Sequence, residues 1–123
     1  MTIDTNILIA YLGGDLAVQK VLSRWRQENK PLFLSAIVEA EILSFADWTE
    51  SDYRFAEKFL EENFAFISFD RMTARIAAHL RRTLKIKLPD AIIAATAIFT
   101  HTPVVTRNYK DFEKIKELRI IVI

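Results

Sequence analysis

Residues 88–99 read Leu-Pro-Asp-Ala-Ile-Ile-Ala-Ala-Thr-Ala-Ile-Phe, and from Asp90 to Phe99 this stretch is apolar almost all round. A helix at the surface would show a polar face, so the pattern predicts a helix that is buried on most sides. Four alanines, at positions 91, 94, 95 and 97, would let neighbouring elements approach it closely. We therefore expect this helix in the interior of the fold.

The segments before and after this helix alternate between strand and helix patterns. Apolar spacing or a capping residue predicts helices over residues 7–12, 15–27, 36–46, 51–62 and 71–84, the first of them after the capping residues Asp4 and Thr5. Short apolar runs predict strands over residues 1–4, 32–34, 64–69, 104–105 and 119–123. Ser35 stands where it would cap the helix at 36–46. Strands separated by helices indicate an α/β fold with a parallel sheet between helices, which binds ligands at the carboxyl ends of its strands.

The composition suits one compact domain over residues 1–123. The chain is 51% hydrophobic, and two Gly and three Pro leave little room for a linker. Because there is no cysteine, disulfides and thiolate metal sites are excluded. The net charge of +1 says little about partners. No apolar run approaches the length of a membrane span, so we expect a soluble, cytoplasmic protein that does not bind membranes.

Four acidic residues fall where an α/β fold places functional groups: Asp4, Glu41, Asp90 and Asp111. Asp4 follows the first strand, Asp90 opens the apolar helix, and Asp111 comes soon after the strand at 104–105. Glu41 lies inside a predicted helix between two apolar residues, where an inward carboxylate is costly unless it is paired or bound to a cation. Taken singly, each acid is also explained as a helix cap or a solvated turn, so only their joint placement supports a site.

If the four carboxylates converge, they repel one another and need compensating positive charge. Ligands that are all oxygen favour hard cations such as Mg²⁺ or Mn²⁺, and a phosphodiester is then the natural substrate. Two such ions, about 4 Å apart, can activate the attacking water and stabilise the leaving oxygen. A site with one tightly held ion is also compatible with the sequence.

Short polar residues and basic residues accompany the acids. Side chains suited to orienting carboxylates or bound water are Thr5, Asn6, Thr106 and Asn108. Ordinary turn and capping chemistry explains those four equally well. Candidate contacts to an RNA backbone are Arg107, Lys110, Lys85 and Lys87, together with Arg81 and Arg82. Charge runs of this kind are more often solvated faces.

Other kinds of catalytic site find no support. His79 and His101 are too few for a histidine zinc site. The chain has no G-x-S-x-G elbow of a serine hydrolase, and neither glycine-rich nucleotide loop, G-x-x-x-x-G-K or G-x-G-x-x-G, is present.

Four segments share their order and spacing with a known family. They are Ile3-Asp4-Thr5-Asn6-Ile7-Leu8-Ile9, Ser35 through Glu41-Ile42-Leu43, Leu88-Pro89-Asp90-Ala91-Ile92-Ile93-Ala94-Ala95-Thr96-Ala97, and Val105-Thr106-Arg107-Asn108-Tyr109-Lys110-Asp111-Phe112. Over essentially the whole chain they resemble the PIN-domain family, and more narrowly its VapC-type ribonuclease toxins of type II toxin–antitoxin pairs. One departure is the very short segment before Asp4.

The resemblance implies a three-layer α/β/α PIN-like fold around a short parallel sheet. It also implies a Mg²⁺- or Mn²⁺-dependent endoribonuclease, a homodimer, and inhibition by a cognate antitoxin. The family's catalytic, metal-binding acids map onto Asp4, Glu41, Asp90 and Asp111, with Asn108 close by. Apolar residues expected at the surface give weak support to the dimer: Trp25, Phe45 and Trp48. The target RNA, the number of ions and the identity of the antitoxin do not follow from the sequence.

Two other interpretations remain open at this point. A PIN-like binding or assembly module with a weak or silent metal site has no need to keep four mutually repelling acids. A DNA-directed nuclease of the wider family would need extra clamps, for which this chain is short. We expect an antitoxin to cover the groove over Asp4 and Asp90, where a basic side chain of the partner could replace metal charge.

Overall fold

A computed structural model describes residues 1–123. Its five strands are β1 (Thr2–Ile3), β2 (Phe33–Ser35), β3 (Ala65–Ile67), β4 (Val104–Thr106) and β5 (Ile120–Val122). Its six α-helices are α1 (Thr5–Leu12), α2 (Leu16–Gln27), α3 (Ala36–Leu43), α4 (Glu50–Asn63), α5 (Arg71–Thr83) and α6 (Leu88–Thr100), and a 3-10 turn, η1, covers Tyr109–Asp111. None of these helices has both the length and the apolar composition needed to cross a membrane.

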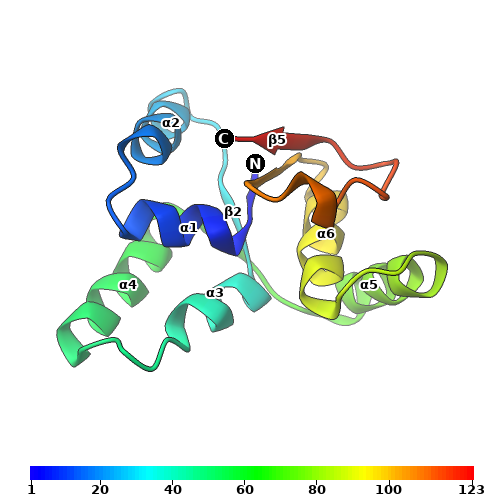
Figure 1. Ribbon diagram of the computed structural model, residues 1–123, viewed down its shortest axis with the longest axis horizontal. Coiled ribbons are helices and arrows are strands. Elements are labelled where there is room, and N and C mark those ends of the chain that lie inside the picture. Colours follow the sequence, from blue (N-terminus) through cyan, green and yellow to red (C-terminus); the bar gives the residue numbers. More distant parts are fainter.

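All pairings in the sheet are parallel, and the strand order is β3-β2-β1-β4-β5. Along the chain, β2 and β3 are added on one side of β1, and β4 and β5 are then added on the other side of β1. Because crossovers between parallel strands are right-handed, this reversal puts the connecting helices on opposite faces. Figure 1 shows α1 to α4 on one side of the molecule and α5 with α6 on the other. The predicted three-layer α/β/α fold is confirmed.

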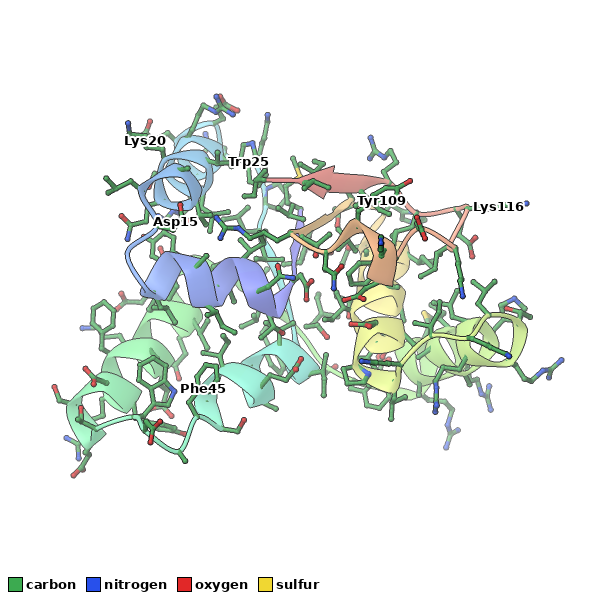
Figure 2. All side chains as sticks on the ribbon, viewed as in Figure 1. Asp15, Lys20, Trp25, Phe45, Tyr109 and Lys116 are labelled. Atoms are coloured by element: carbon green, nitrogen blue, oxygen red, sulfur yellow. The ribbon has the colours of Figure 1, made fainter.

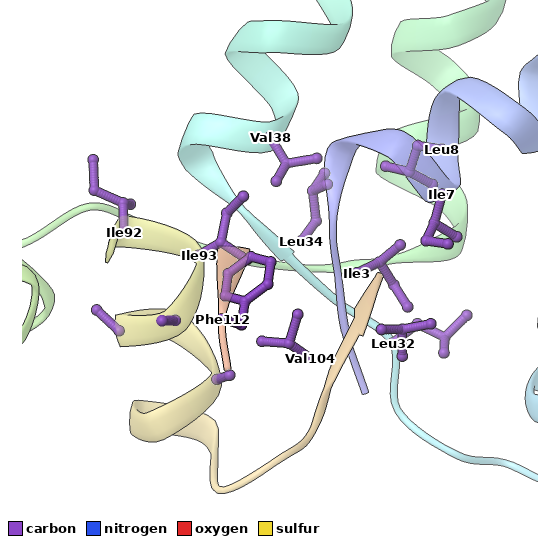
Figure 3. Packing of buried hydrophobic residues seen from close by; sticks show 14 of the residues in the cluster. Ile3, Ile7, Leu8, Leu32, Leu34, Val38, Ile92, Ile93, Val104 and Phe112 are labelled. Carbon is purple, nitrogen blue, oxygen red and sulfur yellow. The ribbon is translucent and has the colours of Figure 1, made fainter. Parts of the chain in front are cut away.

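The helix α6 is the buried helix that its sequence predicts. Residues 91–97 are all buried, and α6 packs on β1, β2 and β4 as well as on α5. Ile93 lies close to Phe112 and to Val104 of the central sheet (Figure 3). Pro89 stands in the first turn, where helices need no backbone donor, and His101 ends the helix in a left-handed conformation.

Two element boundaries differ from the predictions. The helix α3 ends at Leu43, short of residue 46, because the side chains of Ser44 and Trp48 donate hydrogen bonds to backbone carbonyls of its last turn. The strand β3 is limited to residues 65–67, since it lies at the edge of the sheet and pairs only with the three residues of β2.

Ser35 occupies the N-cap position of α3, but its side chain makes no cap hydrogen bond, so this part of the prediction is wrong. The residue is 1% exposed, and its hydroxyl is the one buried side-chain polar atom without a hydrogen-bond partner. Packing rather than a side-chain cap must therefore stabilise the start of α3.

The apolar residues expected at the surface are not all exposed. Trp25 is only 6% exposed and lies on the side of α2 that faces the rest of the molecule, so its predicted exposure is wrong (Figure 2). Phe45, on the connection between α3 and α4, is 45% exposed. Its ring packs edge-on against the half-buried Trp48, with centroids 5.9 Å apart.

Candidate active site

The four acids predicted to form a site come from four places around the carboxyl edge of the sheet. The strand order reverses between β1 and β4, and in open α/β sheets the crevice at such a reversal binds ligands. Asp4 directly follows β1, and Asp111 ends the η1 turn that follows β4. Asp90 lies in the first turn of α6, and Glu41 lies in α3. The topology therefore supports the placement inferred from the sequence.

Asp4 is the most buried of the four, at 5% exposure. Its backbone N–H donates to the carbonyl of Val105 at 3.0 Å, which ties the end of β1 to β4. Its carboxylate accepts hydrogen bonds from the Thr5 N–H (2.7 Å), Asn6 Nδ2 (3.0 Å) and Thr106 Oγ1 (2.6 Å). These donors fix the orientation of the carboxylate and offset part of the cost of burying it.

Hydrogen bonds also reach Glu41 and Asp111. Thr5 Oγ1 donates to Glu41 Oε1 at 3.0 Å, which links α1 to α3. Asn108 Nδ2 donates to Asp111 Oδ2 at 2.7 Å, while the Asn108 N–H donates to the hydroxyl of Thr106 at 2.9 Å. The four polar residues singled out from the sequence thus each donate to one of the acids. Asp90 takes no part in this network.

The charges of the four carboxylates act on one another. Burial raises the pKa of Asp90 to about 6, and the negative charges of Asp111, Asp4 and Glu41 act in the same direction. The positive charge of Lys87 opposes them. Burial also raises the pKa of Asp4, with smaller contributions from Asp111 and Glu41, although the hydrogen bonds it accepts lower it. Such a group of acids favours the binding of positive charge.

No basic side chain neutralises these acids through an ion pair. The structure contains five ion pairs, and none of them includes Asp4, Glu41, Asp90 or Asp111. Arg107 is engaged elsewhere, because its guanidinium is paired with Asp15 at the start of α2. The other predicted RNA contacts are exposed and form no ion pair: Lys110, Lys85, Lys87, Arg81 and Arg82.

The family resemblance implies a divalent metal at these acids. No group of three or more His, Cys, Asp or Glu side chains is arranged to hold a metal ion as the side chains stand. The donor chemistry fits a hard cation nevertheless, because the four acids offer carboxylate oxygens and none of them forms an ion pair. Threonine hydroxyls and the amide of Asn108 lie beside these carboxylates. The residues present therefore suit Mg²⁺ or Mn²⁺ rather than zinc.

Two features of this region were not predicted from the sequence. Arg107 and Asp15 are 92 positions apart, so their ion pair leaves no local signal. Ser35, with its unpartnered hydroxyl, ends β2, the strand beside β1. A serine at the end of an apolar strand and before a helix suits an N-cap equally well, so the sequence carries no signal for an unpartnered hydroxyl.

A family model described as the PIN domain matches residues 1–118, a span that contains all four acids. The chain belongs to the PIN domain family. The family resemblance read from the four sequence segments is confirmed, and the three-layer arrangement described above agrees with it.

Relatives of this PIN domain carry names of the VapC type. A protein named Ribonuclease VapC from Rickettsia bellii is 26% identical over 133 residues, which cover 100% of this chain and 96% of the relative. A toxin–antitoxin complex from Klebsiella pneumoniae contains a chain that is 32% identical with a TM-score of 0.80, over 99% of this chain and 94% of that one. VapBC2 from Rickettsia felis, solved with a DNA fragment from its promoter, shares the fold with a TM-score of 0.85 at 22% identity, over 99% and 97% of the two chains. These similarities confirm the predicted VapC-type resemblance.

Proposed function

We propose that this PIN domain, taken as one domain over residues 1–123, is a VapC-type toxin that cleaves RNA internally with Mg²⁺ or Mn²⁺. The observation that carries the proposal is the group of four mutually interacting acids at the reversal of strand order, none of which has a basic partner. Similarity to Ribonuclease VapC and to a toxin–antitoxin complex supports the substrate class and the kind of partner. The location that suits this substrate is the cytoplasm.

In this proposal Asp4, Glu41, Asp90 and Asp111 hold the metal. When bound, Mg²⁺ or Mn²⁺ supplies the positive charge that a phosphodiester needs beside these acids and promotes attack by water. The donors around Asp4 keep its carboxylate in one orientation, which pre-organises the site. Asp90 has no such donor, and burial raises its pKa to about 6.

The proposal includes an antitoxin that covers the groove over Asp4 and Asp90. A basic side chain from that partner would compensate the same acids and exclude metal and substrate together. It also includes a homodimer of the toxin. A partner that bound elsewhere and left the acids open to RNA would contradict the proposed mode of inhibition.

Cleavage of a mixed cellular RNA pool by the purified protein tests the nuclease. Reactions with Mg²⁺, with Mn²⁺ and with EDTA are compared for wild type, Asp4→Asn and Asp90→Asn. Glu113→Gln is the matched control, since Glu113 is an exposed acid close to Asp111 in sequence and outside the hydrogen-bond network. Discrete fragments that require metal and disappear in the two site variants, but persist in the control, support the proposal. Equal activity in all four proteins would show that the acids do not catalyse.

The alternative is a binding or assembly module with a weak or silent metal site. It predicts no metal-dependent cleavage of RNA and no dependence of partner binding on the four acids. Matched DNA oligonucleotides in the same assay test the third interpretation, a DNA-directed nuclease. If the protein cut DNA in preference to RNA, DNA would become the proposed substrate.

A further inference from the structure

A groove lies along α5 and reaches the first turn of α6. It is lined by the loop before α5 (Phe69), by α5 itself (Ala74, Ala78, Arg81 and Arg82) and by Leu88 of α6. Its volume is about 490 Å³, and it is open to solvent. The distance from Ala74 to Arg82 along the helix is about 12 Å, the length of roughly three stacked nucleotides.

The groove presents apolar surface that the fold leaves uncovered. Phe69 is 48% exposed and Leu88 is 47% exposed. The ring of Phe69 takes part in none of the aromatic pairs in the structure. An exposed ring beside small alanines offers a flat surface, and nucleobases stack on such rings whatever their sequence. One exposed phenylalanine is ordinary on a protein surface; the charged residues near Phe69 set it apart.

Those neighbours are basic. Residues 70–87 contain six Lys and Arg and a single acid, Asp70, whose carboxylate is engaged in capping α5. None of the six basic side chains forms an ion pair. Arg81 Nε donates to the carbonyl of Ile86 at 3.3 Å, which holds this guanidinium in place and leaves its outer nitrogens for another acceptor. By contrast, residues 47–62 contain six acids and two basic residues. Of these six, Arg81 and Arg82 line the groove, whereas Arg71 and Arg75 line a neighbouring hollow. The two arginines at the groove suit phosphate.

The groove reaches the same end of α6 as Asp90. Leu88 and Asp90 lie in the same first turn of α6. Lys87, the residue before that turn, acts on the charge of Asp90. The groove therefore lies within reach of nucleotides that flank a phosphodiester at Asp90 and extend around the start of α6.

We propose that this groove binds a single-stranded stretch of RNA beside the phosphodiester that is cut, with a base stacked on Phe69 and phosphates held by Arg81 and Arg82. The inference rests on the proposed nuclease and adds the form of its substrate. A base within a duplex has no free face for Phe69, so the flanking nucleotides must be unpaired.

A larger hollow of about 680 Å³ uses other residues of α5, including Arg75, together with Ile98 of α6. Ile98 lies near the end of α6 that is opposite Asp90, so this hollow is not continuous with the acids. Arg75 is exposed, forms no ion pair and lies on the same helix as Arg81. Arg75→Ala is therefore the matched control for the loss of one positive charge from α5.

The test measures binding of a short, labelled, unstructured single-stranded RNA by fluorescence anisotropy in EDTA, over a series of salt concentrations. The proteins are wild type, Phe69→Ala, Ala78→Leu, the double variant Arg81→Ala/Arg82→Ala, and Arg75→Ala. We expect Phe69→Ala to raise Kd about tenfold, and Ala78→Leu to raise it by filling the groove. The double variant should reduce the slope of log K against log salt by about 1.4. Arg75→Ala should change neither Kd nor slope by a comparable amount.

Cleavage assays on the same proteins separate this inference from the nuclease proposal. Groove variants should raise KM for RNA and leave kcat unchanged, because the groove contacts nucleotides that do not react. If wild type cuts RNA and the groove variants match Arg75→Ala in Kd and KM, the groove inference is wrong and the nuclease stands. If wild type binds RNA through the groove but cuts none, the nuclease proposal fails and the binding surface stands.

Two further outcomes would also overturn the groove inference. One is that wild type binds no single-stranded RNA, or binds a duplex equally well. The other is that the groove variants change the oligomeric state, measured by light scattering, without changing RNA affinity. The groove would then be covered by a second copy of the chain.

Discussion

Hydrogen bonding is distributed unequally among the four acids. The carboxylate of Asp4 accepts from three donors, those of Glu41 and Asp111 accept from one each, and that of Asp90 accepts from none. Donors stabilise the charged form of a carboxylate, so the acid without them depends most on charge from elsewhere. Asp90 is therefore the acid whose charge the protein stabilises least, and in the proposed metal site it is the residue on which proton and metal would compete.

Asp90→Asn should raise the Tm of the metal-free protein at about pH 7.5, and the gain should shrink as the pH falls toward 4. The pKa of Asp90 is about 6 in the folded protein, above the value near 3.9 of an unfolded chain. At pH values between about 3.9 and about 6, the folded state therefore binds more protons at Asp90 than the unfolded state does. Ionised Asp90 costs stability above pH 6, and protonation removes this cost. We expect about 1 kcal/mol after allowance for solvent screening.

Thermal unfolding of wild type and Asp90→Asn in EDTA at several pH values checks this prediction. The difference between the two proteins at each pH is the quantity to follow, because other carboxylates titrate in both. Glu113→Gln, at an exposed acid, should show no such dependence. A difference in Tm that stays constant from neutral to acidic pH would show that Asp90 has an ordinary pKa.

Ser35→Ala should leave the free energy of unfolding unchanged or increase it. Its buried hydroxyl has no partner, and an unpaired buried polar group costs about 1–3 kcal/mol. A serine that capped α3 would instead lose about 1 kcal/mol on this change. Urea unfolding distinguishes the two signs. Thr49→Ala removes a cap hydrogen bond to the Asp52 N–H and should lose stability; an equal loss in Ser35→Ala would mean that the hydroxyl is satisfied in solution.

The positions of the acids at element boundaries are easier to predict from the sequence than the contacts that bring them into one region. Asp4, Asp90 and Asp111 occupy junctions that alternating strand and helix patterns make visible. Glu41 lies within a helix, and only its tertiary hydrogen bond from Thr5 shows that it faces the same region. The position of Arg107 was predictable, but its engagement by Asp15 was not. Contacts of this kind depend on packing between elements that are distant in sequence.

The ends of the helices and strands in this chain are set by local sequence in some cases and by tertiary contacts in others. The helices α2 and α5 have clear caps at Asp15 and Asp70 and an apolar face, so their limits were predicted closely. The end of α3 depends on the Trp48 side chain, and the length of β3 depends on its pairing with β2. Those two boundaries were therefore missed, because neither partner is visible in the local pattern.

Ala94→Leu should destabilise the protein by about 1–3 kcal/mol, because a larger side chain in a packed core forces its neighbours out of place. Ala94 is fully buried in α6, which packs on both the sheet and α5. Ala78→Leu is the matched control, since Ala78 is exposed on α5 and the same change there should cost little. Equal Tm values for the two variants would show that α6 is not packed as closely as its alanines indicate.

The order of the strands in the sheet is determined by the packing of the whole molecule and not by any single element. Each strand has only two or three residues, and such short runs carry little information on which neighbours they pair with. The alternation of elements predicts a parallel sheet, but the return of the chain past β1 to form β4 does not follow from it. The family resemblance implied three layers and a parallel sheet but no strand order, so the order was not predicted. The reversal matters most for function, because it brings Asp4 and Thr106 together.

Divalent metal should stabilise the whole molecule through the same site. A ligand that binds only the native state adds about 2.7 kcal/mol at a hundredfold excess over Kd, which for a chain of this size raises Tm by on the order of 10 °C. Mg²⁺ or Mn²⁺ should therefore raise the Tm of wild type and of Glu113→Gln, and raise those of Asp4→Asn and Asp90→Asn much less.

The pH dependence of that shift makes the metal experiment specific for the acids. In the proposed site, metal would compete with protons for Asp90, whose pKa is about 6, so the shift in wild type should be larger at about pH 8 than at about pH 5. Metal bound elsewhere on the surface would stabilise all four proteins equally and would not follow the titration of Asp90. A shift absent from every protein, wild type included, would favour the binding module, since a nuclease of the proposed kind must bind its metal to cut.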